Sequence, residues 1–266
     1  MVKKMKSLMN HLSLIRNFKV LYFVILLLPA IVSAETQILE IDTGGHKAMI
    51  WDVIFTNDGR YLVSASSDKT VRIWDTKTGE IIRIIRGQIG KGYEGMIFSA
   101  ALSPDNQLIA VGGWFDKTTA ETPCCGDIHI FSFHTGALIA VLKGHENAVY
   151  GLAFSSDSRY LISGSADNTA RIWNLGKINF NGSGGNGEAV TITSSTSLEG
   201  HTDYLYAVSF SPYGNISVTG SNDHTVKLWD ARSGSLITTM AGHTDKVNSA
   251  VFTPDGRYIL SGGNDR

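Results

Sequence analysis

Apolar and polar residues alternate along this 266-residue chain in short runs that turn residues separate. In the runs Thr70–Trp74 and Thr225–Trp229 every second residue is apolar, which is the period of a strand with one buried face. The runs are bounded by turns such as Thr56–Gly59 and Thr253–Gly256, in which Pro, Asp and Gly favour tight reversals. The pattern predicts an all-β fold of short antiparallel strands.

The strands recur in a fixed order. Each copy begins with a Gly-His pair and continues through a strand ending on Phe, a second strand, a turn with Asp, and a third strand ending on Trp. A fourth strand follows a Gly-containing turn, as at Ile81–Ile85 and Leu236–Met240. Four strands in about 42 residues is the period of a propeller blade. We expect about five four-stranded antiparallel blades, at residues 46–86, 87–142, 145–198, 201–240 and, incomplete, 243–266.

The second repeat departs from the pattern. It has Gly87-Gln88 in place of Gly-His and Phe131 in place of Trp. We expect Ala110 to occupy the position at which the other repeats carry a hydroxyl. An insertion at residues 114–126 lengthens one of its turns. A second insertion, residues 177–196, is rich in Gly, Ser and Asn, and we expect a surface excursion between the third and fourth blades.

The recurring Gly-His, turn Asp and terminal Trp resemble the WD-repeat family, over residues 37–266. The resemblance implies a WD40 β-propeller domain (residues 35–266) in which His, Asp, a strand hydroxyl and Trp form a buried hydrogen-bond network in each blade. One hydroxyl column, at positions 64, 163, 219 and 261, is always Ser or Thr, whereas the column two residues later contains Gly263. We therefore assign these structural networks: His46, Ser64, Asp68, Trp74; His145, Ser163, Asp167, Trp173; His201, Thr219, Asp223, Trp229; His243, Ser261, Asp265.

A Ser-His-Asp set also invites a hydrolase interpretation. Catalysis needs one exposed nucleophile, whereas this set occurs in four of the five repeats. A glycan hydrolase or lyase would need convergent acids in the channel, and the channel positions offer only scattered charges at Asp52, Asp203, Asp245 and Lys246. We expect no catalytic residue and no cofactor.

A partner site is expected where each inner strand begins, because the resemblance implies binding at the rim of the channel entrance. That column is mostly aromatic, and exposed aromatic side chains concentrate binding energy. Its members are Trp51, Phe98, Tyr150, Tyr206 and Asn248. The alternative is that some of the rings pack between blades. The expected function is a protein-interaction scaffold that binds a protein or peptide, with a glycan-binding module, a propeller-fold enzyme, or the recognition part of a longer multidomain protein as alternatives.

The N-terminal residues have a different composition. Five basic and no acidic residues lie in residues 1–34, where an apolar run (Val20–Leu28) precedes the small residues Val32–Ala34. This is typical of a signal peptide cleaved near Ala34, with an uncleaved anchor as the alternative. We expect an exported chain of bacterial type, periplasmic or secreted. Residues 35–266 hold 18 basic and 24 acidic residues, a net charge of −6 that disfavours nucleic acid as a partner.

Both cysteines of the chain are adjacent, at Cys124 and Cys125 in the first insertion. In an oxidising compartment they could form a vicinal disulfide, remain a reactive pair, or bridge to another molecule. A metal site with Asp127 and His129 is not expected, because adjacent thiolates rarely reach one ion together and His129 should point outward.

Closure of the ring is the last expectation from the sequence. Residues 36–41 have the spacing of an outer strand that would close the ring on the last blade. The fifth repeat contains no third strand for that strand to pair with. We expect a chain truncated at its C-terminus, with a five-bladed ring or a strand-swapped oligomer as alternatives; the blade number of the intact protein and the oligomeric state stay open.

Overall fold

The computed structural model describes residues 44–87, 92–115, 126–176, 178 and 189–266, which belong to one compact unit. Every regular element in these ranges is a strand, so the all-β prediction is confirmed. No helix in these ranges is long and apolar enough to cross a membrane. The predicted signal peptide at residues 1–34, the closing strand at residues 36–41, and Cys124 and Cys125 lie outside the described residues.

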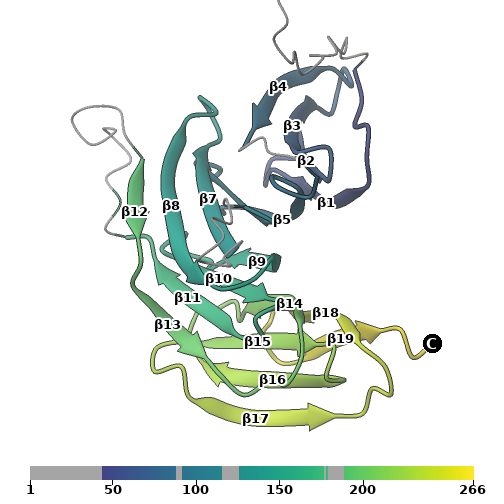
Figure 1. The fold of residues 1–266 in the computed structure, drawn as a ribbon, viewed down its shortest axis with the longest axis vertical. Coiled ribbons are helices and arrows are strands. Elements are labelled where there is room, and N and C mark those ends of the chain that lie inside the picture. Colours follow the sequence, from purple (N-terminus) through teal and green to yellow (C-terminus); the bar gives the residue numbers. More distant parts are fainter. Residues whose placement is uncertain (1–43, 88–91, 116–125, 177, 179–188) are drawn as a thin grey trace, which may run out of the picture. The chain divides into compact units, whose positions relative to one another are not determined.

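The first and fourth sheets each contain four antiparallel strands that are consecutive in the sequence (Figure 1). The first sheet (blade 1) has the order β1-β2-β3-β4, with strands β1 (Ile50–Phe55), β2 (Tyr61–Ser66), β3 (Thr70–Asp75) and β4 (Ile81–Arg86). The fourth (blade 4) has the order β14-β15-β16-β17, with strands β14 (Leu205–Phe210), β15 (Ile216–Ser221), β16 (Thr225–Asp230) and β17 (Leu236–Ala241).

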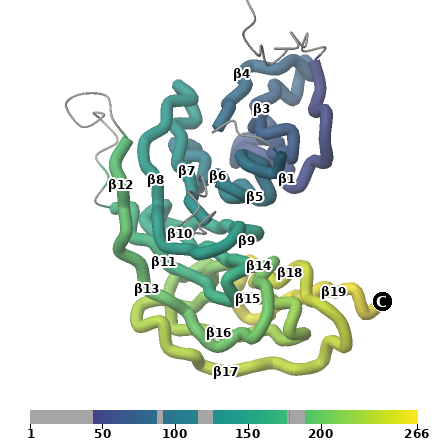
Figure 2. The backbone as a smooth tube through the Cα atoms, viewed as in Figure 1, coloured from purple at the N-terminus to yellow at the C-terminus, as the bar shows by residue number. Residues whose placement is uncertain are grey.

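The second insertion (residues 177–196) contributes residues to a strand of the second sheet and to a strand of the third sheet. Blade 2 contains β5 (Ile97–Leu102), β6 (Leu108–Gly113), β7 (Gly126–Ser132) and β8 (Leu138–His145); blade 3 contains β9 (Val149–Phe154), β10 (Tyr160–Ser165), β11 (Ala170–Asn174) and β13 (Ser195–Leu198). The insertion was expected to be a surface excursion between blades 3 and 4. Instead, β12 (Val190–Ile192) pairs in parallel with β8 as a fifth strand of blade 2, and the chain then continues into β13 (Figure 2). An unpaired sheet edge offers free backbone groups, which explains the addition.

The fifth sheet (blade 5) has two described strands, β18 (Val247–Phe252) and β19 (Ile259–Gly263). In its turn the Thr253 hydroxyl donates to Asp255 at 2.5 Å and Gly256 has a φ of 67°, which is the geometry of the corresponding turn in blade 1. In blade 1, the Thr56 hydroxyl donates to Asp58 at 2.6 Å and Gly59 has a φ of 68°. The positive φ explains why glycine occupies this position.

The strand register corrects one assignment in blade 2. In blade 1, Ser64 pairs with Val53, and in blade 2 the residue that pairs with the equivalent Ala100 is Val111. Val111, not Ala110, therefore stands in the hydroxyl column. The prediction was wrong by one residue because blade 2 has no Gly-His pair and no hydroxyl from which to count the register.

Each sheet has a face that carries the third-strand Trp or its equivalent, here called the Trp face, and an opposite face. Four hydrophobic clusters join successive blades, and each packs the opposite face of one blade on the Trp face of the next. Val63 and Ile73 of blade 1, for example, pack against Phe131 of blade 2. Trp173 lies in the cluster with blade 2, Trp229 in the cluster with blade 3, and Val218 joins Val247 and Ala250 between blades 4 and 5.

The turns add a second, polar connection between blades. Asn57 Nδ2 of blade 1 donates to the carbonyl of Pro104 in blade 2 at 2.6 Å. Ser156 Oγ of blade 3 donates to the carbonyl of Pro212 in blade 4 at 2.9 Å. Asn57 and Ser156 occupy the same position of the turn in their blades, so the same kind of hydrogen bond joins blade 1 to blade 2 and blade 3 to blade 4.

This alternation of faces makes a prediction about two equivalent phenylalanines. Phe210 is 8% exposed on the Trp face of blade 4, whereas Phe55 is 61% exposed on the Trp face of blade 1. We expect Phe210→Ala to lower the free energy of unfolding by about 3–5 kcal/mol. Phe55→Ala should change it by roughly 0.5 kcal/mol, as substitutions on the surface usually do. Urea unfolding in dilute solution measures both, and equal losses would contradict the assignment of the open face.

Candidate functional site

The network residues of blade 3 lie within hydrogen-bonding distance of one another. His145 Nδ1 is 2.7 Å from Asp167 Oδ2, and its Nε2 is 2.7 Å from Ser163 Oγ. Trp173 Nε1 donates to the same Ser163 Oγ at 2.9 Å. His145, Ser163 and Trp173 are all buried. His145 is the last residue of β8, so the network joins the end of that strand of blade 2, just before β9, to β10, β11 and the turn between them.

The other blades with a Gly-His pair repeat this geometry. In blade 1, His46 is 2.9 Å from Asp68 and 2.7 Å from Ser64; in blade 4, His201 is 2.7 Å from both Asp223 and Thr219. In blade 5, His243 is 2.8 Å from Asp265 and 2.9 Å from Ser261. The side chains of His243 and Asp265 are partly exposed to solvent. Trp74 and Trp229 donate to the hydroxyls of Ser64 and Thr219 at 2.8 Å.

Proton positions follow from the donors available. The Asp167 carboxylate accepts, so Nδ1 of His145 carries the proton, and Nε2 then accepts from the Ser163 hydroxyl while the Trp173 indole donates to Ser163. Burial lowers the pKa of His145, against the raising effect of the Asp167 carboxylate, so the imidazole is held neutral. A neutral imidazole fixed between two partners is a rigid connector.

The aspartates are held ionised by their donors. Burial raises the pKa of Asp167, but hydrogen bonds from His145, Thr169 and the Glu146 N–H outweigh it and hold the pKa well below its ordinary value. In blade 4 burial is opposed in the same way by Thr225 and His201, which lower the pKa of Asp223 to about 2. The carboxylates accept from their neighbours and are not available as general acids.

Sequence reasoning missed further members of these networks. A threonine two residues after each turn Asp donates to its Oδ1 at 2.6–2.7 Å, at Thr70, Thr169 and Thr225. The hydroxyl column that we set aside accepts from the N–H of the turn Asp, as Ser66 does from Asp68 at 3.1 Å. Both columns recur in the sequence and could have been found there.

The predicted rim residues come together as a row of aromatic rings. The ring centroids are 5.5 Å apart for Trp51 and Phe98, 5.2 Å for Phe98 and Tyr150, and 5.3 Å for Tyr150 and Tyr206. The row therefore runs across blades 1 to 4. The rings also pack on one another between blades. Packing between blades was the alternative to partner binding in the sequence analysis, and it describes part of their role.

Polar groups extend this row in blades 4 and 5. Tyr204, which the sequence reasoning did not include, lies 6.5 Å from Tyr150, and the Lys246 ammonium lies 5.3 Å from the centroid of Tyr206. Asn248, the non-aromatic member of the column, donates to Asn264 Oδ1 at 2.5 Å. Burial raises the pKa of both Tyr150 and Tyr206, so their hydroxyls stay protonated donors.

A small pocket of about 160 Å³ is lined in part by the Tyr150 and Tyr206 rings. Asp52 is one of its lining residues and accepts a hydrogen bond from the Ala100 N–H at 2.9 Å, which links blades 1 and 2. Burial raises the pKa of Asp52 against the lowering effect of its bonds to Ala100 and Ser99. The remaining lining is mostly small, including Ser99, Gly151 and Ala207. This space is about large enough for one side chain.

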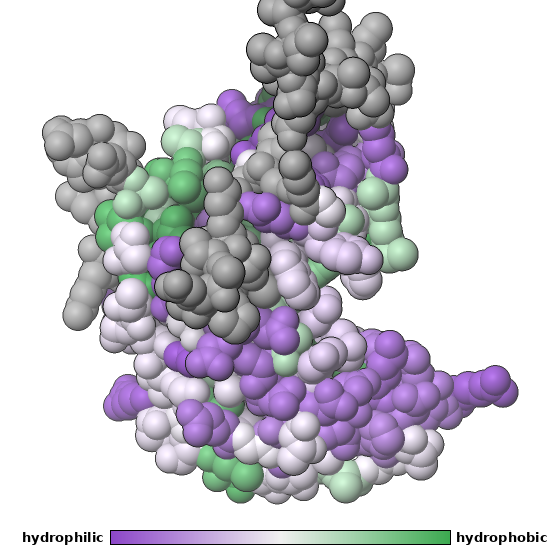
Figure 3. Space-filling model, viewed as in Figure 1, coloured by the Kyte–Doolittle hydropathy of each residue, from purple (hydrophilic) through white to green (hydrophobic). Residues whose placement is uncertain are grey.

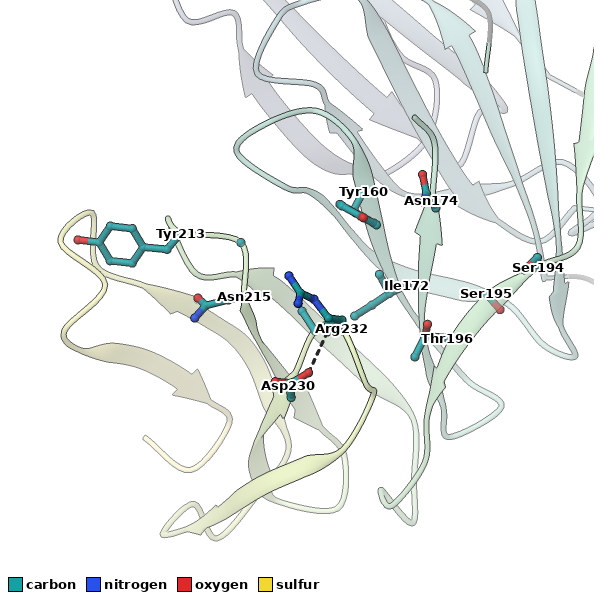
Figure 4. A pocket seen from close by; sticks show the side chains of 12 residues that line it. Tyr160, Ile172, Asn174, Ser194, Ser195, Thr196, Tyr213, Asn215, Asp230 and Arg232 are labelled. Carbon is teal, nitrogen blue, oxygen red and sulfur yellow. Dashed lines mark hydrogen bonds between the residues drawn. The ribbon is translucent and has the colours of Figure 1, made fainter. Parts of the chain in front are cut away.

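A larger groove, of about 640 Å³, lies between blades 3 and 4 at the other end of these strands (Figure 4). Arg232 points into it, with Tyr160 and Asn174 on one side and Asn215 on the other. Ser195, near the end of the second insertion, also lines it. The sequence analysis did not single out this groove, although some of its lining residues, such as Tyr160 and Gly214, recur at equivalent positions of other blades.

The described residues contain no group of three or more His, Cys, Asp or Glu side chains that could hold a metal ion. One expectation behind the argument against a metal was wrong. His129 does not point outward: it is buried and stacks on Phe115 with ring centroids 4.6 Å apart. It pairs with Val111 as Arg72 pairs with Ser64, and in blade 2 this face of the sheet packs on blade 1. Arg72 is buried as well.

Sheets of this kind, each pinned by a His-Asp-hydroxyl-Trp network and packed face to face, define a β-propeller repeat protein. A family model described as WD domain, G-beta repeat matches residues 37–75, 136–174, 192–230 and 234–266. The chain belongs to the WD-repeat family. Residues 76–135, which contain most of the divergent blade 2, fall outside these matches.

Curated relatives share the repeats over part of their length. The chain is 34% identical over 128 residues to Transducin beta-like protein 2 of Homo sapiens, covering 48% of this chain and 27% of the relative. It is 32% identical over 194 residues to Apoptotic protease-activating factor 1 of Rattus norvegicus, covering 73% and 13%. With Small ribosomal subunit protein RACK1y of Oryza sativa subsp. japonica it shares 29% identity over 195 residues, covering 73% and 51%. The chain thus spans about half or less of these relatives.

The networks predict unequal effects of removing equivalent aspartates. Asp167→Ala leaves the buried His145 Nδ1–H without its acceptor, and we expect it to lower the free energy of unfolding by about 1–3 kcal/mol. Asp265→Ala should cost less, because the side chains of Asp265 and His243 are each about 20% exposed and water can replace the carboxylate. Thermal melting with far-ultraviolet circular dichroism measures both. Equal losses would contradict a dependence on burial.

Proposed function

We propose that this WD-repeat protein is a non-catalytic interaction scaffold that binds a protein or peptide partner at the rim of the channel entrance. The observation that carries the proposal is the row of aromatic rings from Trp51 to Tyr206. Stacked rings present a large, rigid contact area that loses little conformational entropy on binding. The Tyr hydroxyls and Lys246 beside them supply donors for the carbonyl groups of a peptide.

The networks argue against the alternative of a propeller-fold enzyme. The hydroxyls of Ser64, Ser163 and Thr219 are within hydrogen-bonding distance of an imidazole and accept from an indole. Each such hydroxyl is buried and already engaged, so none is presented to a substrate. The relatives point the same way, since one of them is by name a protein of the small ribosomal subunit. A recognition module within a longer multidomain protein would use the same rim.

The rim proposal predicts that two tyrosines carry partner binding. Replacing Tyr150 and Tyr206 together by Ala should weaken the affinity for a partner recovered by pull-down by about 10-fold or more, because large interface aromatic side chains each contribute above about 1 kcal/mol. Isothermal titration calorimetry with the recovered partner measures the change. Unchanged affinity in a folded double variant would refute the rim proposal.

Tyr213→Ala is the matched control for this experiment. Tyr213 is a tyrosine of blade 4, like Tyr206. It is exposed, whereas Tyr206 is partly buried, and it lies after the opposite end of β14 and lines the groove of Figure 4. Full affinity in the Tyr213 variant supports the rim. Loss of affinity in this variant alone would instead assign the partner to the groove.

We further propose that the chain is exported, with cleavage near Ala34. Support comes from the basic residues, apolar run and small residues of the N-terminal segment. Expressed in a bacterium, the chain should be recovered outside the cytoplasm with an N-terminus close to Glu35, which N-terminal sequencing of fractionated cells measures. Replacing Leu26 and Leu27 by Arg should retain it in the cytoplasm. Recovery of an intact Met1 N-terminus in the cytoplasmic fraction would contradict export.

A further inference from the structure

The interface between blades 3 and 4 is less filled than the two that precede it. The difference lies two residues after the third-strand Trp or its equivalent. Between blades 1 and 2 this residue is Phe133, which is buried with its ring centroid 5.8 Å from that of Tyr61, and between blades 2 and 3 it is the fully buried Leu175. Blade 4 has Ala231 there, and Tyr160, the equivalent of Tyr61 in the strand register, is 39% exposed on the facing blade 3. The small alanine leaves room for the groove of about 640 Å³.

A second small residue lies next to Ala231 on the same face of blade 4. Ser217 pairs with the third-strand Trp, at the position held by Ile109 in blade 2 and Leu161 in blade 3. Both aliphatic side chains are buried in the clusters that join their blades to the preceding ones. Ser217 is fully buried too, but its hydroxyl has no hydrogen-bond partner among the described residues. Apolar side-chain volume is therefore missing at two successive positions that are filled in both preceding interfaces.

Polar side chains surround this unfilled space. Arg232 points into the groove, and the amides of Asn174 and Asn215 lie on its two walls (Figure 4). Oδ1 of Asp230 is held by its own turn, since it accepts from the N–H groups of Arg232 and Ser233 and from the Ser233 hydroxyl at 2.7–3.0 Å. In the view of Figure 3 the surface over blade 4 is mostly hydrophilic or intermediate, with only small hydrophobic patches. The groove thus combines a confined apolar space with a cation and two amides.

We propose that the groove between blades 3 and 4 is a second binding site, for a peptide that carries a large apolar side chain next to an acidic residue. The apolar side chain takes the place that Phe133 and Leu175 hold in the preceding interfaces. The carboxylate pairs with Arg232, because a planar guanidinium donates two parallel hydrogen bonds to such a group. Asn174 and Asn215 supply donors and acceptors for the peptide backbone. This site goes beyond the rim, since it lies at the other end of the strands.

The experiment selects the ligand on the full chain from a phage-displayed library of random heptapeptides, after depletion on the Ala231→Phe variant. The introduced ring should occupy the groove as Phe133 occupies the equivalent place, so the depletion removes peptides that bind elsewhere, including at the rim. The surviving peptides should carry a large apolar residue next to, or one residue away from, Asp or Glu. Thermal melting should show the Ala231→Phe chain to be at least as stable as the parent, because the ring fills unoccupied space.

A fluorescein-labelled synthetic copy of the enriched peptide then measures affinity by fluorescence anisotropy. Ala231→Phe should weaken binding by about 10-fold or more, as the loss of a buried anchor does. Arg232→Gln should weaken it by about 10-fold and reduce its dependence on salt, and since Arg232 is exposed this variant keeps the fold. Ala231→Ser is the matched control, because it leaves the groove open and should bind as the parent does. The double variant of Tyr150 and Tyr206 should also bind as the parent does.

Several results would overturn the proposal. One is that no peptide survives the depletion, and another is that the surviving peptides lack an acidic residue. Full affinity in the folded Ala231→Phe chain would exclude the groove. Loss of affinity only in the double variant of Tyr150 and Tyr206 would assign the peptide to the rim, which removes the second site and leaves the rim proposal standing. Saturable binding of glucuronate without any enriched peptide would assign the groove to a glycan instead.

Discussion

The buried imidazole is the constraint on which the rest of this fold depends. A propeller blade is a small sheet, and the turn between its second and third strands would be free to shift without a connection to the segment before the first strand. The imidazole supplies that connection, because it meets the carboxylate of this turn through Nδ1 and a hydroxyl of the second strand through Nε2. The hydroxyl in turn accepts from the indole of the third strand. Leaving any of these groups unpaired in the interior would cost about 1–3 kcal/mol.

Blade 2 shows what happens where the imidazole is missing. Val111 and Phe131 replace the hydroxyl and the indole, so the polar network gives way to apolar packing that needs no partners. All three losses occur together, as expected if a partial network would be worse than none. The blade keeps its four strands and gains β12 as a fifth. The network therefore stabilises a blade without being needed to form one.

The sequence predicted most of the fold because its signals are local. Strand period, turn residues and the Gly-His to Trp spacing placed the strands in blades 1, 3 and 4, and the His, Asp and hydroxyl positions that the structure brings together. Where prediction failed, the cause was not local. The register of blade 2 depended on contacts with its neighbours, and β12 depended on the free edge of β8 in another blade. The burial of His129 depended on the blade in front of it.

The position of the rim follows from the strand geometry of the blades. The rim residue follows the first residue of each inner strand, so the place of that strand in its sheet sets where the ring lies, in blade 2 as in the blades with a network. Rings from four blades then meet at 5.2–5.5 Å, although they are 47 to 56 residues apart in sequence from one blade to the next. Stacking between blades and contact with a partner are therefore compatible roles. The inter-blade packing holds the rings in place, and rings held in place lose little further entropy when a partner binds.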